Sequence, residues 1–183
     1  MKLKLLGGIS IASTLLCGPI LTHAAIANPQ WGYKGSVLPP SKWATQYSQC
    51  QPGGLQTPIN INTHEVTKIA SSHITFNFNA PATDIINNGH SIQINFPNNG
   101  DDVTINNKLY HLLQFHFHSP SENTINGMHY PIEMHFVLQG KKQQLVVVGE
   151  FFKIGQANPA LTALWQHLPG AKGQSISMRN MNV

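Results

Sequence analysis

Charge is scarce in this sequence of 183 residues, because Asp, Glu, Lys and Arg together make up only 10% of it. The few basic residues form no stripe or cluster, which excludes the electrostatic footprint of a nucleic-acid-binding protein. Internal repeats and linkers are absent as well, so we expect a single domain. The length is sufficient for one domain with a substantial core.

The first 27 residues have the pattern of a secretory signal peptide. Lys2 and Lys4 precede an apolar run from Leu5 to Leu21, and Ala25-Ile26-Ala27 offers a small-x-small cleavage site. Glycines and a proline interrupt the run, which favours a leader over a membrane-spanning helix. We therefore expect the chain from residue 28 to be periplasmic or secreted, with no membrane span after cleavage.

Cysteine is almost missing, with 2 residues in the whole chain. Cys17 lies in the predicted leader, and Leu16 before it is larger than the usual lipoprotein signal allows. Cys50 is then the single cysteine of the mature chain. A lone cysteine in an exported protein is either a free thiol or lacks its partner.

The remainder of the chain has the pattern of many short strands separated by Asn- and Gly-containing turns. The segment 28–56 is rich in Trp, Tyr, Gly and Pro and predicts irregular structure with a short helix at 41–47. A short extended piece at 56–61 follows it. Strands are then expected at 74–78, 83–87, 91–96, 102–106, 109–118, 131–139 and 145–152, with turn signals at 88–89, 98–100, 126–127 and 139–140.

One helix is expected late in the chain, where Asn158 can cap it and Pro159 suits its first turn. Ala160 to His167 continue the helix until Pro169 and Gly170 end it. The predicted fold class is therefore mainly β (α+β). We expect a single domain around a mostly antiparallel twisted sheet with short peripheral helices.

Two of the predicted strands carry histidines on one face. Side chains alternate along a strand, so His116 and His118 point the same way, with Gln114 behind them and Leu113, Phe115 and Phe117 opposite. In the second strand, Glu133, His135 and Val137 share one face, and the other face is apolar. If the two strands are neighbours, three imidazoles converge.

Three neutral imidazoles with a fourth position open are typical of a catalytic zinc site rather than a structural one. The imidazoles of a zinc site need an acceptor on their other nitrogen. Gln114 and Glu133 each lie two residues from a candidate ligand on the same face and suit that role. Glu133 as a fourth ligand is the alternative, although residues i and i+2 of one strand rarely both reach one ion.

These motifs together resemble the α-class carbonic anhydrase signature. The match consists of Gln-Phe-His-Phe-His at 114–118, Ser-Glu-Asn-Thr at 121–124 and Glu-Met-His-Phe-Val at 133–137. Further matches in the family's order are Gln-Thr-Pro-Ile-Asn-Ile at 56–61, Asn-Asn-Gly-His at 87–90, Leu-Val-Val-Val-Gly at 145–149 and Phe-Lys-Ile-Gly at 152–155. Asn123 departs from the family, in which many members carry histidine.

The resemblance implies reversible hydration of carbon dioxide to bicarbonate by zinc-bound hydroxide. His116, His118 and His135 would hold Zn²⁺, which lowers the pKa of its bound water to about 7, an effect for which carbonic anhydrase is the standard example. His90 would carry the proton to solvent, because imidazole titrates near neutrality. The remaining implied roles concern Glu122, which would orient the hydroxyl that positions the attacking hydroxide, and an apolar wall for carbon dioxide formed by Val137 and Val147.

The resemblance also implies a chain that lacks the family's last strands, since the sequence stops at Val183 before a Thr-Thr-Pro-Pro-Cys-type segment. That segment would supply the partners of Glu122 and Cys50. A truncated, inactive zinc-binding remnant is therefore the main alternative function. A cupin-type metalloprotein, using Glu122 as a ligand, is a further alternative that leaves the motifs at 56–61 and 87–90 unexplained.

Overall fold

The computed structural model describes residues 31–33, 35–53, 55–67, 73–97 and 100–178. The predicted leader, residues 1–27, and residues 98–99 of one predicted turn lie outside these ranges. The chain divides into two compact units, Met1–Trp43 and Ala44–Val183.

The first unit has its described residues held together by aromatic side chains. The rings of Trp31, Tyr33 and Trp43 meet edge to face, with centroids 5.4 to 6.0 Å apart. The indole nitrogen of Trp43 donates to the carbonyl of Leu38 at 3.0 Å. The short helix expected here is a 3₁₀ helix, η1 (Pro40–Thr45), which crosses into the second unit and is followed by η2 (Ser48–Cys50).

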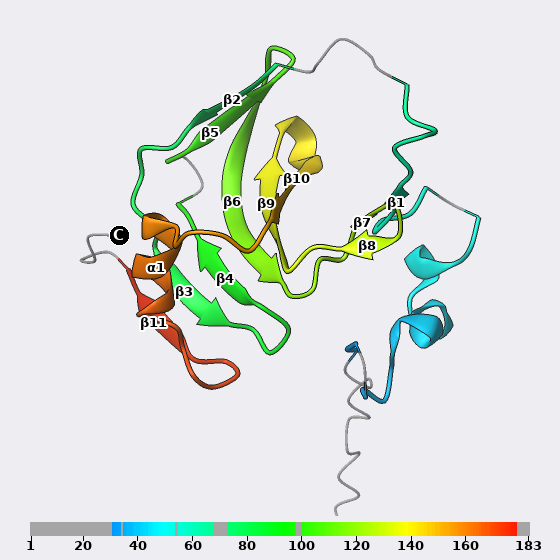
Figure 1. Cartoon of the computed structure of the whole chain (residues 1–183). Coiled ribbons are helices and arrows are strands. Elements are labelled where there is room, and N and C mark those ends of the chain that lie inside the picture. Colours follow the sequence, from blue (N-terminus) through cyan, green and yellow to red (C-terminus); the bar gives the residue numbers. More distant parts are fainter. Residues whose placement is uncertain (1–30, 34, 54, 68–72, 98–99, 179–183) are drawn as a thin grey trace, which may run out of the picture. The chain divides into compact units, whose positions relative to one another are not determined.

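An antiparallel, eight-stranded sheet dominates the second unit (Figure 1). Its strand order is β10-β9-β6-β4-β3-β11, and β5 pairs with both β6 and β2. The bounds are β2 (Ile74–Asn77), β3 (Asp84–Asn87), β4 (Ile92–Asn95), β5 (Asp102–Ile105), β6 (Lys108–His118), β9 (Ile132–Gln139), β10 (Leu145–Phe152) and β11 (Ser175–Ser177). The predicted fold class is confirmed.

A second, three-stranded sheet consists of β1 (Asn60–Ile61), β7 (Thr124–Ile125) and β8 (Met128–His129), with β1 and β7 parallel. Asn126 and Gly127 close the β7–β8 hairpin with φ angles of 51° and 76°. This Asn-Gly pair suits a two-residue hairpin because both residues tolerate positive φ. The predicted turn at 126–127 is therefore confirmed.

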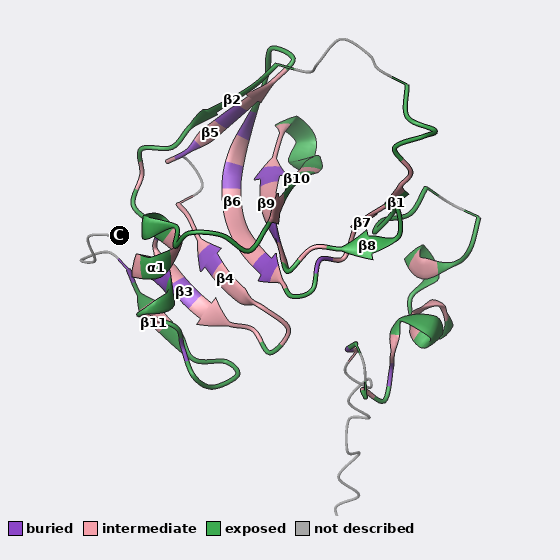
Figure 2. Ribbon diagram, viewed as in Figure 1, coloured by how far each residue is buried: buried purple, intermediate pink, exposed green. Residues whose placement is uncertain are grey.

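One face of the large sheet is apolar and carries the core. Figure 2 shows buried residues along the strands of this sheet. The helix α1 (Pro159–Trp165) covers part of this face: Leu164 is 6% exposed, and the ring of Trp165 lies 4.8 Å from that of Phe117. Burial of a leucine of this kind contributes about 1.5–3 kcal/mol. The side chain of Asn158 accepts from the backbone N–H of Ala160 and Leu161, which confirms the predicted cap.

The long strand β6 contains a bulge between Leu112 and Gln114. The sequence predicted strict alternation, with Leu113 on the apolar face beside Phe115. The bulge breaks that alternation: Leu112, paired with Leu138, is the buried residue at 1% exposure, and Leu113 is only partly buried. A bulge inserts one extra residue into a strand and so resets which side chains face the core.

The remaining elements are short. The helix η3 (Lys141–Gln143) connects β9 to β10. No helix in the described parts of the chain combines the length and apolar character that a membrane span requires.

Candidate metal centre

Three histidines converge on the sheet face opposite the core. His116 on β6 is paired directly with His135 on β9, and His118 lies two residues further along β6. The ring centroids are 4.9 Å apart for His116 and His118, 5.3 Å for His116 and His135, and 4.7 Å for His118 and His135. One ring nitrogen of each histidine lies within 4.8 Å of the other two. This donor set fits one zinc ion.

Two polar side chains fix the orientation of these rings. The amide oxygen of Gln114 lies 2.9 Å from Nδ1 of His116, and the carboxylate Oε1 of Glu133 lies 3.1 Å from Nε2 of His135. An acceptor at each of these nitrogens places the proton there and leaves the lone pair on the other nitrogen. Nε2 of His116 and Nδ1 of His135 are thus the nitrogens left to bind a metal.

The third histidine provides a test of whether a metal suits the site. Nε2 of His118 is buried, and no hydrogen-bond partner for it lies in the described part of the chain. Oε2 of Glu122 lies 3.4 Å from this nitrogen and 3.9 Å from Nδ1 of His135. A buried polar atom without a hydrogen bond is costly, and metal coordination satisfies such an atom. The geometry therefore fits a cation among the three rings.

Two of the three imidazoles, those of His116 and His118, have a lowered pKa and are therefore uncharged at neutral pH. Burial, together with the proximity of His118 and His135, lowers the pKa of His116 to about 4. Burial also lowers the pKa of His118, although the charge of Glu122 opposes that effect. Neutral imidazoles have a free lone pair, which a metal ion requires.

Glu133 is the most deeply buried charged group beside this cluster, at 1% exposure. Its Oε2 accepts from the backbone N–H of Glu122 at 2.8 Å and of Asn123 at 2.9 Å. Its Oε1 accepts from the side-chain amide of Asn123 at 2.7 Å as well as from His135. Burial raises the pKa of Glu133, but these hydrogen bonds outweigh it, and the net pKa is lowered. The carboxylate is therefore ionised and firmly held.

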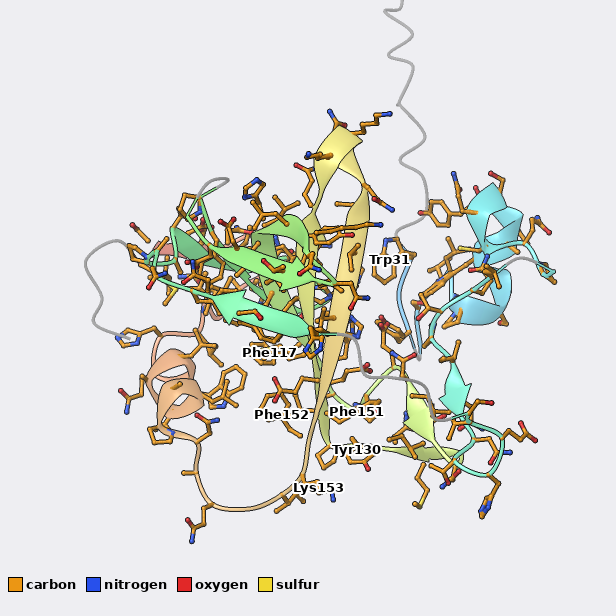
Figure 3. The ribbon with its side chains drawn as sticks, turned by 90° about the horizontal axis from the view of Figure 1, so that it is seen from above. Trp31, Phe117, Tyr130, Phe151, Phe152 and Lys153 are labelled. Atoms are coloured by element: carbon orange, nitrogen blue, oxygen red, sulfur yellow. The ribbon has the colours of Figure 1, made fainter. Side chains whose placement is uncertain are left out.

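Strand β10 completes the surroundings of Glu133. Gly149 is paired with His135, and a Cβ at that glycine would lie 3.1 Å from Oε1 of Glu133. Phe151 is paired with Glu133 and stacks on Tyr130 with centroids 4.7 Å apart (Figure 3). A glycine at 149 thus lets β10 approach the carboxylate and the ring that it supports.

Of the other predicted site residues, the two valines lie on the same sheet face as the imidazoles, whereas His90 lies in a turn outside the cluster. Val137 is paired with Gln114 on one side and with Val147 on the other, so both valines lie on the histidine face of the sheet. Val147 is 54% exposed. His90 lies outside the cluster, in the turn between β3 and β4, where its N–H donates to Oδ1 of Asn88 at 2.9 Å.

Sequence reasoning missed the contributions of Asn123 and Gly149. The sequence comparison marks Asn123 only as a departure from the family, yet Asn123 gives Glu133 two hydrogen bonds, one from its backbone and one from its side chain. Gly149 was part of a matching motif without a role. A signal was present for Asn123, since an amide can donate to a carboxylate just as histidine can.

Comparison with known proteins agrees with the geometry. The sequence profile of the eukaryotic-type carbonic anhydrase family matches residues 38–183. A carbonic anhydrase of Pectobacterium atrosepticum is 35% identical over 175 residues, which cover 94% of this chain and 70% of the relative. A carbonic anhydrase of Neisseria gonorrhoeae is 36% identical over 167 residues, which cover 89% of this chain and 65% of the relative.

A solved structure gives the same result. The α-carbonic anhydrase of Thermovibrio ammonificans, in complex with the inhibitor sulfanilamide, matches with a TM-score of 0.76 and 37% identity. The match covers 83% of this chain and 68% of that chain. The resemblance of the histidine motifs is thereby confirmed: the chain belongs to the eukaryotic-type, or α-class, carbonic anhydrase family.

Proposed function

We propose that this chain binds one zinc ion through His116, His118 and His135 and catalyses the reversible hydration of carbon dioxide to bicarbonate and a proton. The observation that supports this most directly is the convergence of three imidazoles, each offering one nitrogen within 4.8 Å of the others. When bound, zinc supplies Lewis-acid activation of a water molecule at neutral pH.

The protein's own groups are proposed to prepare the site. Gln114 and Glu133 hold two of the rings by their outer nitrogens, at 2.9 and 3.1 Å. The carboxylate of Glu122 is close to ring nitrogens of His118 and His135 and is an acceptor suited to orienting the hydroxyl group that positions the attacking hydroxide. Val137 and Val147 give carbon dioxide, which is apolar, an apolar surface beside the imidazoles.

The first test measures carbon dioxide hydration directly. We expect the purified chain loaded with one equivalent of zinc to accelerate hydration well above the buffer rate. A strong chelator should abolish the activity and added zinc should restore it, because the imidazoles alone offer no Lewis acid. Stopped-flow detection with a pH indicator gives the rate, and elemental analysis gives the metal content.

The alternative, a zinc-binding protein without activity, has one observation in its favour. Val147 is 54% exposed, so the proposed apolar wall is open to water on the β10 side. The same experiment separates the two functions: one equivalent of bound zinc with hydration at the buffer rate would establish the alternative. Export to the periplasm or exterior stays a prediction.

His90 is proposed to carry the proton from the site to solvent. Its position in a turn of the site-bearing sheet, held by Asn88, supports this role. We expect His90→Ala to slow turnover in dilute buffer by about 100-fold, the lower end of the range for loss of a proton-transfer group. Concentrated imidazole buffer should restore part of the rate, and zinc content should not change. Equal losses in dilute and concentrated buffer would assign His90 a structural role instead.

A further inference from the structure

A chain of side-chain hydrogen bonds runs across β3 and β4 towards the turn that contains His90. The amide nitrogen of Asn95 donates to Oδ2 of Asp84 at 3.0 Å. The amide nitrogen of Gln93 donates to Oδ1 of Asn95 at 2.7 Å, and that of Asn88 donates to Oε1 of Gln93 at 3.2 Å. Four side chains from 84 to 95 are thus connected without a break.

The groups at the two ends of this series of hydrogen bonds determine which way each amide donates. A carboxylate only accepts, so Asp84 requires the NH₂ group of Asn95 to face it. The oxygen of Asn95 then faces Gln93, whose oxygen faces Asn88. At the far end, Oδ1 of Asn88 accepts from the backbone N–H of His90 at 2.9 Å and of Ser91 at 2.8 Å, and a backbone N–H only donates. A flip of any one amide would place two donors or two acceptors together.

Asp84 is well supplied with donors at its own end. Besides Asn95, its carboxylate accepts from the hydroxyl of Thr83 at 2.9 Å and from the hydroxyl of Ser175 on β11 at 3.1 Å. Three hydrogen bonds, from Thr83, Asn95 and Ser175, therefore fix the carboxylate of Asp84. Each side-chain amide further along the hydrogen-bonded series can rotate unless a neighbour restrains it.

The hydrogen-bonded side chains of Asp84, Asn95, Gln93 and Asn88 lie on the same sheet face as the imidazoles. Gln93 is paired with His116 and Asn95 with Gln114, the residue whose oxygen holds His116. Paired residues of neighbouring antiparallel strands have their side chains on the same side. The amide chain is therefore a lateral neighbour of the candidate metal centre.

The turn is tied to the metal-binding strand at a second point. The hydroxyl of Ser91 donates to the carbonyl of Phe117 at 2.5 Å and accepts from the N–H of Phe117 at 3.0 Å. Phe117 lies between His118 and His116. Residues 88–91 are thus held by the amide chain on one side and by the backbone of β6 on the other.

We infer that Asp84 is a positioning residue for proton transfer, acting through Asn95, Gln93 and Asn88 to hold the His90 turn in one geometry beside the imidazoles. This role rests on the proposed function, in which His90 carries the proton. Asp84 acts as a hydrogen-bond acceptor here. It fixes the orientation of Asn95, which fixes that of Gln93 and then of Asn88, and Asn88 holds the backbone of the turn. Loss of the anchor frees each amide to rotate.

The experiment compares Asp84→Ala and Gln93→Leu with Asp84→Asn, which keeps an acceptor oxygen for Asn95. Asp102→Ala is the matched control. Asp102 lies on the same sheet, but its carboxylate pairs with His111 at 2.6 Å and takes no part in the hydrogen bonds between Asp84 and Asn88. Amide hydrogen exchange of His90 and Ser91 is measured by NMR on the zinc-loaded protein. Turnover in dilute and in imidazole buffer, and zinc content, are measured on the same samples.

We expect Asp84→Ala and Gln93→Leu to accelerate exchange at His90 and Ser91 by roughly three- to tenfold, the effect of losing one restraining hydrogen bond. Turnover in dilute buffer should fall by a similar factor and recover in imidazole buffer, at unchanged zinc content. Asp84→Asn and Asp102→Ala should resemble the unmodified chain in both measurements.

Two results would overturn the inference. One is unchanged exchange at His90 and Ser91 in both chain-breaking variants, which would show that the amides do not hold the turn. The other is an equal fall of turnover in dilute and imidazole buffer, which would show that Asp84 acts on the whole fold. If the unmodified chain hydrates no carbon dioxide, the proposed function fails separately, and the exchange data still decide whether Asp84 positions the turn.

Discussion

Replacement of His135 by alanine is expected to reduce bound zinc from about one equivalent to near zero under dialysis against a weak chelator. Two imidazoles remain, both from β6, and the cross-strand ligand is lost. Removing a ligand weakens binding by more than the roughly 10- to 100-fold that follows loss of a group supporting a ligand. Carbon dioxide hydration should fall with zinc content. Elemental analysis and the hydration assay measure the two effects.

The matched control is His111→Ala. His111 lies on β6, on the same sheet, but its ring is 45% exposed and pairs with Asp102 outside the cluster. Zinc content and activity should be unchanged in this variant. Circular dichroism of both variants without metal checks that the sheet is formed. Full zinc stoichiometry in a folded His135→Ala variant would contradict the assignment of three histidine ligands.

The histidine cluster could be predicted from the sequence because a strand has a fixed period. His116 and His118 had to share a face, and a single pairing of β6 with β9 brings His135 opposite His116. The long strands were predictable for the same reason, since Leu145–Phe152 and Ile132–Gln139 are long enough to show their pattern. The turn at 126–127 and the cap at Asn158 were predictable from local residue chemistry.

The shortest strands and the bulge of β6 could not be predicted by periodicity. β1, β7 and β8 have two residues each, and β11 has three, which is too short for an alternating pattern. The bulge between Leu112 and Gln114 has no sequence signal, because none of the three residues is a glycine. These features depend on pairing partners distant in the sequence.

The surroundings of Glu133 also depend on tertiary contacts. Asn123 is ten residues away along the chain, and only the return of β9 beside the 121–124 loop brings its amide to the carboxylate. The proximity of Gly149 to the same carboxylate requires the register of β10 against β9. A sequence motif therefore predicts which residues form the site, whereas the hydrogen bonds that hold them are visible only in the folded chain.

Glu133→Gln is expected to weaken zinc binding by roughly 10- to 100-fold while the three ligands stay in place. If the glutamine oxygen accepts from the backbone N–H of Glu122 and Asn123, its NH₂ group must face Nε2 of His135. That nitrogen then has to accept, so the ring proton moves to Nδ1, the nitrogen that faces the metal. The substitution thus changes the tautomer of His135 and removes its lone pair from the site.

The same variant should lose about 1–3 kcal/mol of unfolding free energy at neutral pH, because a buried acceptor facing several donors is replaced by a donor. The pKa of Glu133 is lowered from its usual 4.5 in the folded chain. The stability that this carboxylate contributes is therefore present above pH 4.5 and is lost as the pH falls through the folded pKa. Denaturant titrations from about pH 3 to about pH 7 should show the unfolding free energies of the two proteins converging at the acidic end.

Glu150→Gln is the matched control for this prediction. Glu150 lies on β10 next to Gly149 but is exposed, so the same chemical change there removes no buried acceptor. Zinc affinity and unfolding free energy should stay close to those of the unmodified chain, within about 0.5 kcal/mol. Zinc affinity is measured by competition with a chromogenic chelator at pH 7. An equal loss of affinity in the two variants would mean that the negative charge near the site matters, rather than the hydrogen bond from Glu133 to His135.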